Sequence, residues 1–387
     1  MPELGLSQDQ IGWLETVFLV SYTGLQIPGG IVGQVFGPRL MLTLCGLVAV
    51  AATLAIPVLP SAFGGGALFA ALLTAQFLLG AMQAPLFPLV SGGLERWFAS
   101  RQWALTQGLT TAGTGLGSAA APAVIATLMV LVGWRHALVL AALPVAALLA
   151  LWWWFGRDTP YQHPLVRPDE LADLDHTEPA VSIVTWVRTS ALMRNRNMLG
   201  LTLSYLFMNV VFYLITLWSF LYLVQARHFS VLDGGLAASA PPLAGAAGAA
   251  LGGFAGSFCT ARFGAARGLR VVPLITLPAS GLLLLCVQAD SAFWALVGLA
   301  LSFGLLEMNE ACFWAASMEI GREDAPAAGA ILNTGGNLGG IIATPVVAHL
   351  SGLGNWTLPF TLGAGCAVAS AALWLFIAPI PVANAEQ

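Results

Sequence analysis

Eleven long apolar runs constrain what this chain of 387 residues can fold into more than any other feature. The hydrocarbon core of a bilayer is about 30 Å thick, so a helix needs roughly 20 apolar residues to cross it. The runs lack the alternating pattern that is typical of membrane barrels. We therefore predict an all-α membrane protein with about 11 transmembrane helices. The runs lie at about 10–33, 40–60, 64–94, 103–132, 135–155, 197–224, 234–259, 269–287, 291–319, 328–352 and 355–379.

The composition supports a membrane protein and gives no sign of an enzyme. With 58% hydrophobic and only 8% charged residues, the chain has too little polar surface to cover a soluble globule. The five cysteines stand alone in apolar surroundings, and no Ser/His/Asp, phosphate-loop or zinc pattern is present. We expect the lipid bilayer and a small-molecule solute as partners, with no nucleic acid, no metal and no cofactor.

The basic residues predict the orientation in the membrane. All 14 are arginines, and if the break at 34–39 is cytoplasmic, only Arg135 and Arg227 fall outside. Such a bias is typical of cytoplasmic loops. The sequence thus predicts a multi-pass protein of the cell membrane with its N-terminus outside and its C-terminus in the cytoplasm.

A long polar break divides the apolar runs into two sets. We predict an N-terminal helical bundle at 1–156, a cytoplasmic linker at 157–196 and a C-terminal bundle at 197–387. A weak internal repeat supports this division, because GGIVGQVFGPR (29–39) is similar to GGFAGSFCTARFG (252–264). Two similar bundles joined by a linker are typical of transporters.

Two acidic residues lie inside the ninth run, which is otherwise apolar around them. Glu307, Glu310 and Trp314 follow the i, i+3, i+7 spacing that places side chains on one helical face. A charge that faces lipid costs about 2.5 kcal/mol or more, so we expect this face to border a hydrated cavity. Neighbouring carboxyls do not readily ionise together. We predict that Glu310, with Glu307 as its partner, couples proton movement to solute movement; the alternative is that protonated acids bond a neighbouring helix.

Polar side chains at helical spacing form stripes on other runs. Residues four or seven positions apart share one face of a helix. Two interpretations stay open: the stripes bind the solute, or they bond neighbouring helices at about 0.6 to 2 kcal/mol per contact. The predicted substrate-binding residues are Tyr22, Gln26, Gln83, Tyr205, Asn209, Tyr213, Trp314, Asn333 and Asn337.

Six stretches carry a resemblance to a known family. They are SYTGLQIPGG (21–30), LLGAMQAPLFPLVSGGLERWF (78–98), GWRHAL (133–138), RDTPYQHPLV (157–166), YLVQARHFSVLDGGLAASAPPLAGAAGAALGG (222–253) and FWAASMEIGREDAPAAGAILNTGGNLGGI (313–341). Over about residues 4–380 the chain resembles the major facilitator superfamily and, within it, the anion:cation symporter branch, whose members carry organic acids with protons or sodium.

The resemblance implies a secondary transporter that works by alternating access. It implies proton-coupled symport of a small organic anion, such as a carboxylate or a sugar acid, by a protein that functions as a monomer. It also places Arg39, Arg262 and Arg267 in cytoplasmic gating loops that brace the two halves. A plain positive-inside role explains these arginines equally well.

The chain departs from the family pattern at charged positions. Gln34 and Ser257 stand where the superfamily's cytoplasmic loops usually carry an acid. Gln76 and Gln83 stand where the fourth helix of the branch often has an arginine and a glutamate. No basic residue then lies in a membrane core, so two further interpretations stay open: a transporter of neutral solutes, and a transport-inactive receptor or truncated remnant.

The start of the chain also departs from the family. The stretch ELGLSQDQIGWLET (3–16) resembles the external loop that leads into the family's second helix, and family members usually have twelve helices. Removal of one helix leaves facing apolar surfaces without a partner. We therefore expect a longer gene to supply the first helix, and an arginine in that helix would restore the anion interpretation.

Overall fold

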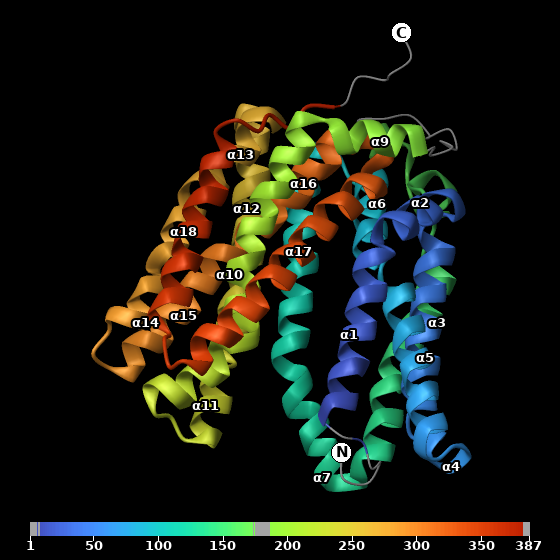
Figure 1. The fold of residues 1–387 in the computed structure, drawn as a ribbon. Helices are drawn as coiled ribbons and strands as arrows, with labels where there is room; N and C mark the ends of the chain where they lie inside the picture. Colours follow the sequence, from blue (N-terminus) through green and yellow to red (C-terminus); the bar gives the residue numbers. More distant parts are fainter. Residues whose placement is uncertain (1–5, 7, 173, 175–185, 382–387) are drawn as a thin grey trace.

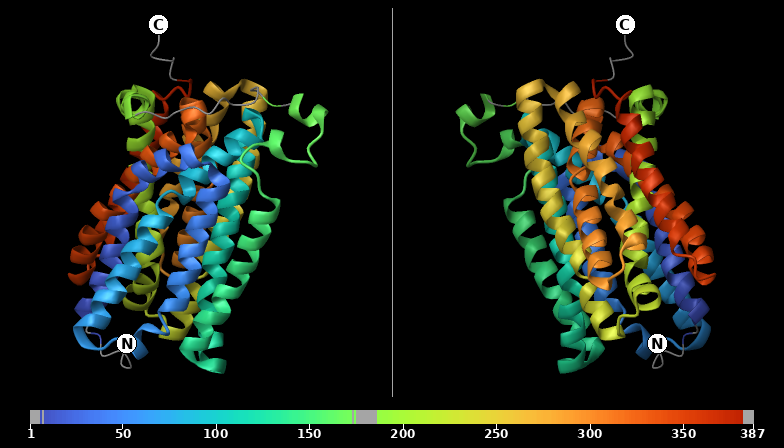
Figure 2. Two further views of the ribbon diagram at one scale, coloured as in Figure 1. Left: turned by 90° about the vertical axis from the view of Figure 1, so that its right-hand side faces the viewer. Right: turned by 90° about the vertical axis from the view of Figure 1, so that its left-hand side faces the viewer.

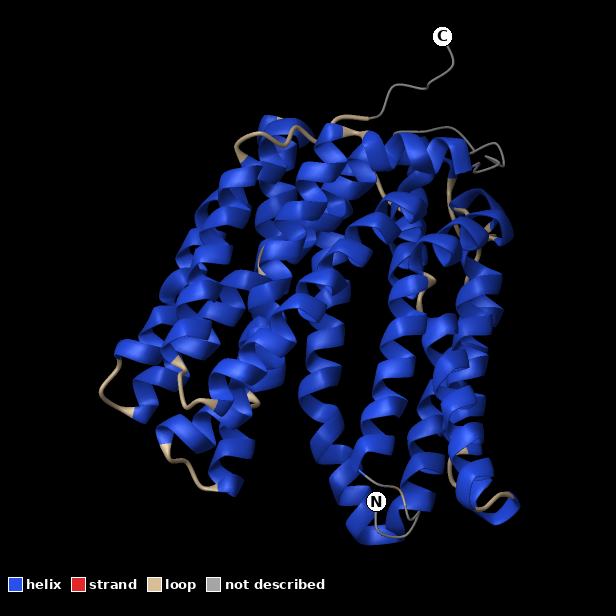
Figure 3. Ribbon diagram, viewed as in Figure 1, coloured by secondary structure: helices blue, strands red, loops and turns tan. Residues whose placement is uncertain are grey.

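The computed structural model of the protein describes residue 6, residues 8–172, residue 174 and residues 186–381. Within these residues it contains helices and connecting loops and no strand (Figure 3). The two ends of the chain and residues 175–185 of the predicted linker lie outside the described residues. The all-helical prediction is confirmed for the part of the chain that the structure covers.

Two groups of helices stand side by side (Figure 1). We call α1 to α7 the N-terminal group and α10 to α18 the C-terminal group. The N-terminal group comprises α1 (Gln8–Gly24), α2 (Gln26–Phe36), α3 (Pro38–Ala55), α4 (Leu59–Ala62), α5 (Gly65–Gln83), α6 (Leu86–Trp97) and α7 (Trp103–Phe155). In the sequence, α8 (Pro168–Ala172) and α9 (Trp186–Arg194) come between the two groups. The C-terminal group comprises α10 (Arg196–Arg227), α11 (Val231–Ala237), α12 (Ala240–Phe263), α13 (Ala265–Ala279), α14 (Leu285–Gln288), α15 (Ala292–Glu307), α16 (Glu310–Gly321), α17 (Ala325–Gly352) and α18 (Thr357–Trp374).

The described helices match the predicted apolar runs. By length and composition, eight helical stretches can cross a membrane, or nine if the bent pair α1 and α2 counts as one span. Two stretches are long enough for two crossings, since Ser100–Phe155 has 56 residues and Ala292–Gly352 has 61. The first divides at Gly133, whose φ of 78° is not helical, and the second at the turn Arg322–Asp324. With these divisions each of the eleven predicted runs has its helical counterpart.

Several runs that the sequence presents as continuous are interrupted in the structure, among them the first, the third and the ninth. The first bends by 56° between α1 and α2, where Pro28 lacks the N–H that would bond an earlier carbonyl. The third is divided between α5 and α6 at Pro85 for the same reason. The ninth is divided between α15 and α16, at Met308 and Asn309. Each of these three runs therefore corresponds to two helices.

The two groups meet at the end of the molecule where α9 lies, which we call the α9 end (Figures 1 and 2). There the backbones of α7 and α12 come very close, because a Cβ added to Gly108 would lie 2.7 Å from Cα of Gly253. Small residues permit such an approach between membrane helices. Gly253, which belongs to the second copy of the internal repeat, is therefore required for the contact between the groups.

Polar contacts join the groups at the same end. Nε2 of Gln34 donates to the carbonyl of Glu323 and, at 3.2 Å, to Oδ1 of Asp324. The backbone N–H of Leu105 donates to Oγ of Ser257 at 2.8 Å. Both residues that replace an expected acid, Gln34 and Ser257, thus take part in contacts between the groups.

Candidate functional site

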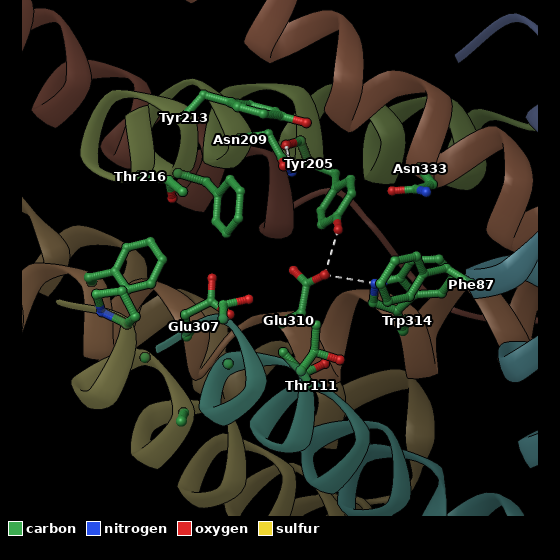
Figure 4. Close-up of a pocket in the computed structure, with 18 of the residues that line it drawn as sticks. Phe87, Thr111, Tyr205, Asn209, Tyr213, Thr216, Glu307, Glu310, Trp314 and Asn333 are labelled. Atoms are coloured by element: carbon green, nitrogen blue, oxygen red, sulfur yellow. Dashed lines mark hydrogen bonds between the residues drawn. The ribbon is translucent and has the colours of Figure 1, made fainter. Parts of the chain in front are cut away.

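A cavity of about 270 Å³ lies between the two groups (Figure 4). Its lining is mostly apolar and aromatic, with hydroxyls, amides and two carboxyls, and the described lining contains no basic side chain. The N-terminal group contributes Tyr22, Phe87, Thr111, Thr114, Gly115 and Ser118. The C-terminal group contributes Tyr205, Asn209, Phe212, Tyr213, Thr216, Pro242, Gly245, Ala246, Phe303, Glu307, Glu310, Trp314, Asn333 and Asn337.

The interruption between α15 and α16 positions the two acids. Glu307 is the last residue of α15 and Glu310 the first of α16. Between them Asn309 is fully buried, and its Nδ2 donates to the carbonyls of Leu305 and Leu306 at 2.8 and 2.9 Å. Its Oδ1 accepts a hydrogen bond from Thr276 of α13 at 2.7 Å. A buried amide therefore holds the turn in place, with an acid on either side of it.

The carboxyl of Glu310 accepts hydrogen bonds from two side chains of the C-terminal group. Its Oε1 accepts hydrogen bonds from the hydroxyl of Tyr205 at 2.6 Å and from the indole Nε1 of Trp314 at 2.8 Å (Figure 4). Both distances fall in the range of bonds to an ionised acceptor. Tyr205 belongs to α10 and Trp314 to α16, so this carboxyl needs no partner from the N-terminal group.

Glu307 lies on the same side of the cavity but has a different environment (Figure 4). Only 7% of it is exposed, and its Oε1 is buried without a hydrogen-bond partner in the protein. Gly245 of α12 makes room for it, since a Cβ there would lie 3.0 Å from Cγ of Glu307. A buried acceptor without a donor is destabilising, so this oxygen is available to a proton or a ligand donor.

A chain of hydrogen bonds crosses the cavity from one group to the other. The hydroxyl of Tyr213 donates to Oδ1 of Asn337 at 2.7 Å, and Nδ2 of Asn337 donates to the carbonyl of Asn333 at 2.9 Å. Nδ2 of Asn333 then donates to the hydroxyl of Tyr22 at 3.3 Å. These four side chains, with Asn209, all line the cavity.

Two of the predicted substrate-binding residues lie elsewhere. Gln26 is fully buried, and its Oε1 accepts a hydrogen bond from Thr334 of α17 at 3.4 Å, so it bonds a neighbouring helix. Gln83 is half-buried at the end of α5 and is absent from the described lining. The structure brings the other seven together around the two acids.

The sequence interpretation missed a polar stripe on α7. Thr111, Thr114 and Ser118 follow i, i+3, i+7 spacing and line the cavity from the N-terminal group. The same spacing rule could have found them. Other threonines of α7, such as Thr106 and Thr110, carry the same polar signal outside the described lining, so the pattern alone does not single out these three residues.

The predicted gating arginines do not themselves join the groups. Arg39 stays within the N-terminal group, with its guanidinium 4.5 Å from the ring centre of Trp153 and a hydrogen bond to the carbonyl of that residue. Arg262 and Arg267 are exposed on α12 and α13. An arginine that does contact the opposite group is Arg322, whose guanidinium lies 5.2 Å from the ring centre of Trp103 of α7.

Known proteins resemble this chain in sequence and in fold. A family sequence model described as Major Facilitator Superfamily matches residues 1–327. The probable sulfoacetate transporter SauU of Cupriavidus necator is 27% identical over 391 residues, which cover 98% of this chain and 87% of that protein. The probable galactarate/D-glucarate transporter GudP of Bacillus subtilis is 26% identical over 393 residues, which cover 98% and 86%.

The comparison with solved structures shows likeness of fold. The fucose:proton symporter FucP of Escherichia coli has a TM-score of 0.72 and 16% identity, over 96% of this chain and 91% of that one. The relatives are named as transporters and not as enzymes, in agreement with the prediction.

Proposed function

Because the chain belongs to the major facilitator superfamily, we propose that it carries a small organic acid across the cell membrane together with protons, by alternating access. The N-terminal group (1–156) and the C-terminal group (197–387), joined by the linker 157–196, would rock about the cavity between them. One chain contributes both walls of this cavity, which supports a monomer as the functional unit.

The arginines support one orientation in the membrane. We place the α9 end in the cytoplasm, with the C-terminus, because Arg39, Arg262 and Arg267 lie there and positive charge is retained on the inner side. The contacts of Gln34 with Asp324 and of Leu105 with Ser257 would then close the cytoplasmic side. This supports assignment of the structure to a state whose cavity faces the outside.

The observation that carries the proposal is the position of the two acids. Glu307 and Glu310 line a cavity at the boundary of two helix groups, where one side and then the other becomes accessible to water. Acids inside transmembrane segments mark proton and solute pathways, because they are expensive to maintain there. A carboxyl that is neutral in one facing state and ionised in the other couples proton movement to the exchange of states.

The names of the relatives and the lining of the cavity support a small organic acid as the solute. Sulfoacetate, galactarate and D-glucarate are the small acids for which two of the relatives are named. A cavity of about 270 Å³ is near the lower end of small-molecule sites, which span roughly 300–1,000 Å³. Hydroxyls and amides such as Thr111, Tyr213 and Asn337 are suited to the hydroxyls of a sugar acid.

A second candidate function is transport of an uncharged polar solute. The observation that favours it is the lack of a basic side chain among the described lining residues, since an anion next to two carboxyls gains no ion pair. Protonation of a cavity acid before the anion binds would reduce this conflict, and it is the reason that proton coupling belongs to the proposal.

Uptake into proteoliposomes tests both candidates. Galactarate, D-glucarate and sulfoacetate would be offered with an inward proton gradient, a sodium gradient or no gradient, and a hexitol would serve as the neutral solute. We expect accumulation of an acid against its gradient only with protons. Accumulation of the hexitol instead would favour the second candidate, whereas binding without accumulation would indicate a receptor.

Variants provide the control. The double change Glu307→Gln and Glu310→Gln should abolish accumulation that depends on the proton gradient. Glu170→Gln makes the same chemical change on an exposed helix, α8, and should transport like the original protein. Unchanged proton-driven uptake in the double variant would remove these acids from the proposal.

A further inference from the structure

The two cavity acids differ in their hydrogen bonds, and the difference assigns them different roles. Glu310 receives two donors on one oxygen, whereas Glu307 has a buried oxygen that receives none. We infer that Glu307 is the acid that gains and loses the coupled proton, and that Glu310 remains an ionised anchor. The assignment depends on the proposed proton coupling and reverses the order of importance that the sequence suggested.

The partners of Glu310 favour its ionised form. An indole N–H can only donate, so the bond from Trp314 requires an acceptor at Oε1. The hydroxyl of Tyr205 donates to the same oxygen at 2.6 Å, within the range for O–H donors to a carboxylate. Two such donors stabilise a negative charge at this position without help from a ligand.

The surroundings of Glu307 offer no equivalent stabilisation. On α12 it faces the bare backbone of Gly245, and on α7 the described lining has hydroxyls and no charge. The titratable lining groups are Glu310 on α16, Tyr205 and Tyr213 on α10, and Tyr22 on α1, all acidic or neutral. An ionised carboxylate that is buried and unpaired is strongly disfavoured, and a second negative charge three residues away adds to this. Glu307 is therefore the member of the pair that takes up a proton.

The proton step is a simple acid–base exchange. When the cavity opens to the acidic side, water delivers a proton to the Glu307 carboxylate, which becomes a neutral carboxylic acid. The anionic solute then enters a cavity with one negative charge fewer, and the neutral acid offers its O–H as a donor to the solute. When the cavity opens to the other side, the solute leaves and Glu307 returns the proton to water.

Infrared difference spectroscopy tests the assignment directly. A protonated carboxyl has a carbonyl stretch that shifts in D₂O, and titration of the purified full chain from high to low pH should make this band appear. We expect the band of the buried carboxyl in the original protein and in Glu310→Gln, and its loss in Glu307→Gln. A band that persists in Glu307→Gln and is lost in Glu310→Gln would overturn the assignment.

Transport measurements separate this assignment from the proposed function. In proteoliposomes, uptake by Glu307→Gln should be the same with and without a proton gradient, while residual uptake by Glu310→Gln should still increase with the gradient. Glu307→Asp keeps a titratable group at the site and should keep the response. If the original protein shows no response to the gradient, the proposed coupling fails; if it responds and only Glu310→Gln loses the response, the role of Glu307 fails alone.

Discussion

The contact between α7 and α12 allows a sharp test of the proposed motion of the two helix groups. Gly108 of α7 has no room for a side chain, because an added Cβ would lie 2.5 Å from the carbonyl oxygen of Ala249 and 2.7 Å from Cα of Gly253. Both neighbours are backbone atoms of the opposite group, which cannot rotate away as a side chain can. Gly108→Ala should therefore separate the groups at the α9 end.

The size of the effect follows from the clash. Overpacking of a tight contact costs about 1 to 3 kcal/mol. If the contact exists only in the state that is closed at the α9 end, the whole penalty acts on that state. The population ratio of the two states would then shift by about 5- to 150-fold toward the state that is open at this end.

Distances between spin labels measure this shift. Labels at Phe36 of α2 and Phe263 of α12, both exposed, would report the separation of the groups in a background without the five native cysteines. Gly113→Ala is the matched control, since it lies on the same helix with open space around its Cβ position. We expect longer distances for Gly108→Ala and an unchanged distribution for Gly113→Ala. Identical distributions for both variants would refute the argument from close packing.

Three further changes test the acids, the turn between them and the closed end. Tyr205→Phe removes one of the two donors to Glu310 and should weaken proton-driven uptake roughly tenfold, because a hydrogen bond to a charged group contributes about 1.5 kcal/mol. Uptake at the original rate would show that this bond is dispensable. Asn309→Ala removes the side-chain hydrogen bonds to the carbonyls of Leu305 and Leu306 and the acceptor of the Thr276 hydroxyl, and should lower the free energy of unfolding by about 1 to 3 kcal/mol, seen as a lower Tm in detergent. An unchanged Tm would contradict the role of the buried amide. Gln34→Glu places a carboxylate where Nε2 of Gln34 now lies 3.2 Å from Oδ1 of Asp324, and repulsion of up to about 4 kcal/mol should open the α9 end. The spin labels at Phe36 and Phe263 would measure the longer distance, and a distance equal to that of the original protein would count against this contact as part of the closure.

Gln34 illustrates how a local pattern and a distant contact combine. The sequence marks it as a neutral residue where the family usually has an acid, but it does not say what Gln34 meets. In the structure the acid comes from the other group, as Asp324, which also pairs with Arg188 of α9 at 2.8 Å. Gln34 can donate to that carboxylate, whereas an acid could not. The departure from the family pattern thus has a physical explanation that requires both halves of the chain.

Gln26 and the α7 stripe show the limits of periodicity. Gln26 and Tyr22 are spaced to share a helical face, yet only Tyr22 lines the cavity. Gln26 lies one turn further along the chain, after the bend between α1 and α2, and there it bonds Thr334 of α17. Spacing along one helix cannot distinguish these positions, because the bend and the neighbouring helix decide which part of a face meets the cavity. Thr111 was missed for the same reason, since its helix has several polar positions and only one face borders the void.

The sequence by itself determined the helical membrane fold, because the apolar length needed to cross a bilayer is a local property of each run. It also marked Glu307 and Glu310, because the penalty for a charge in hydrocarbon does not depend on the rest of the fold. Only the tertiary structure decided which acid has donors and which has none. That difference arises from Tyr205, Trp314 and Gly245, and two of these three reach the acids from other helices. Hydrogen-bond partners are set by packing between distant segments, and a single-chain pattern does not contain that information.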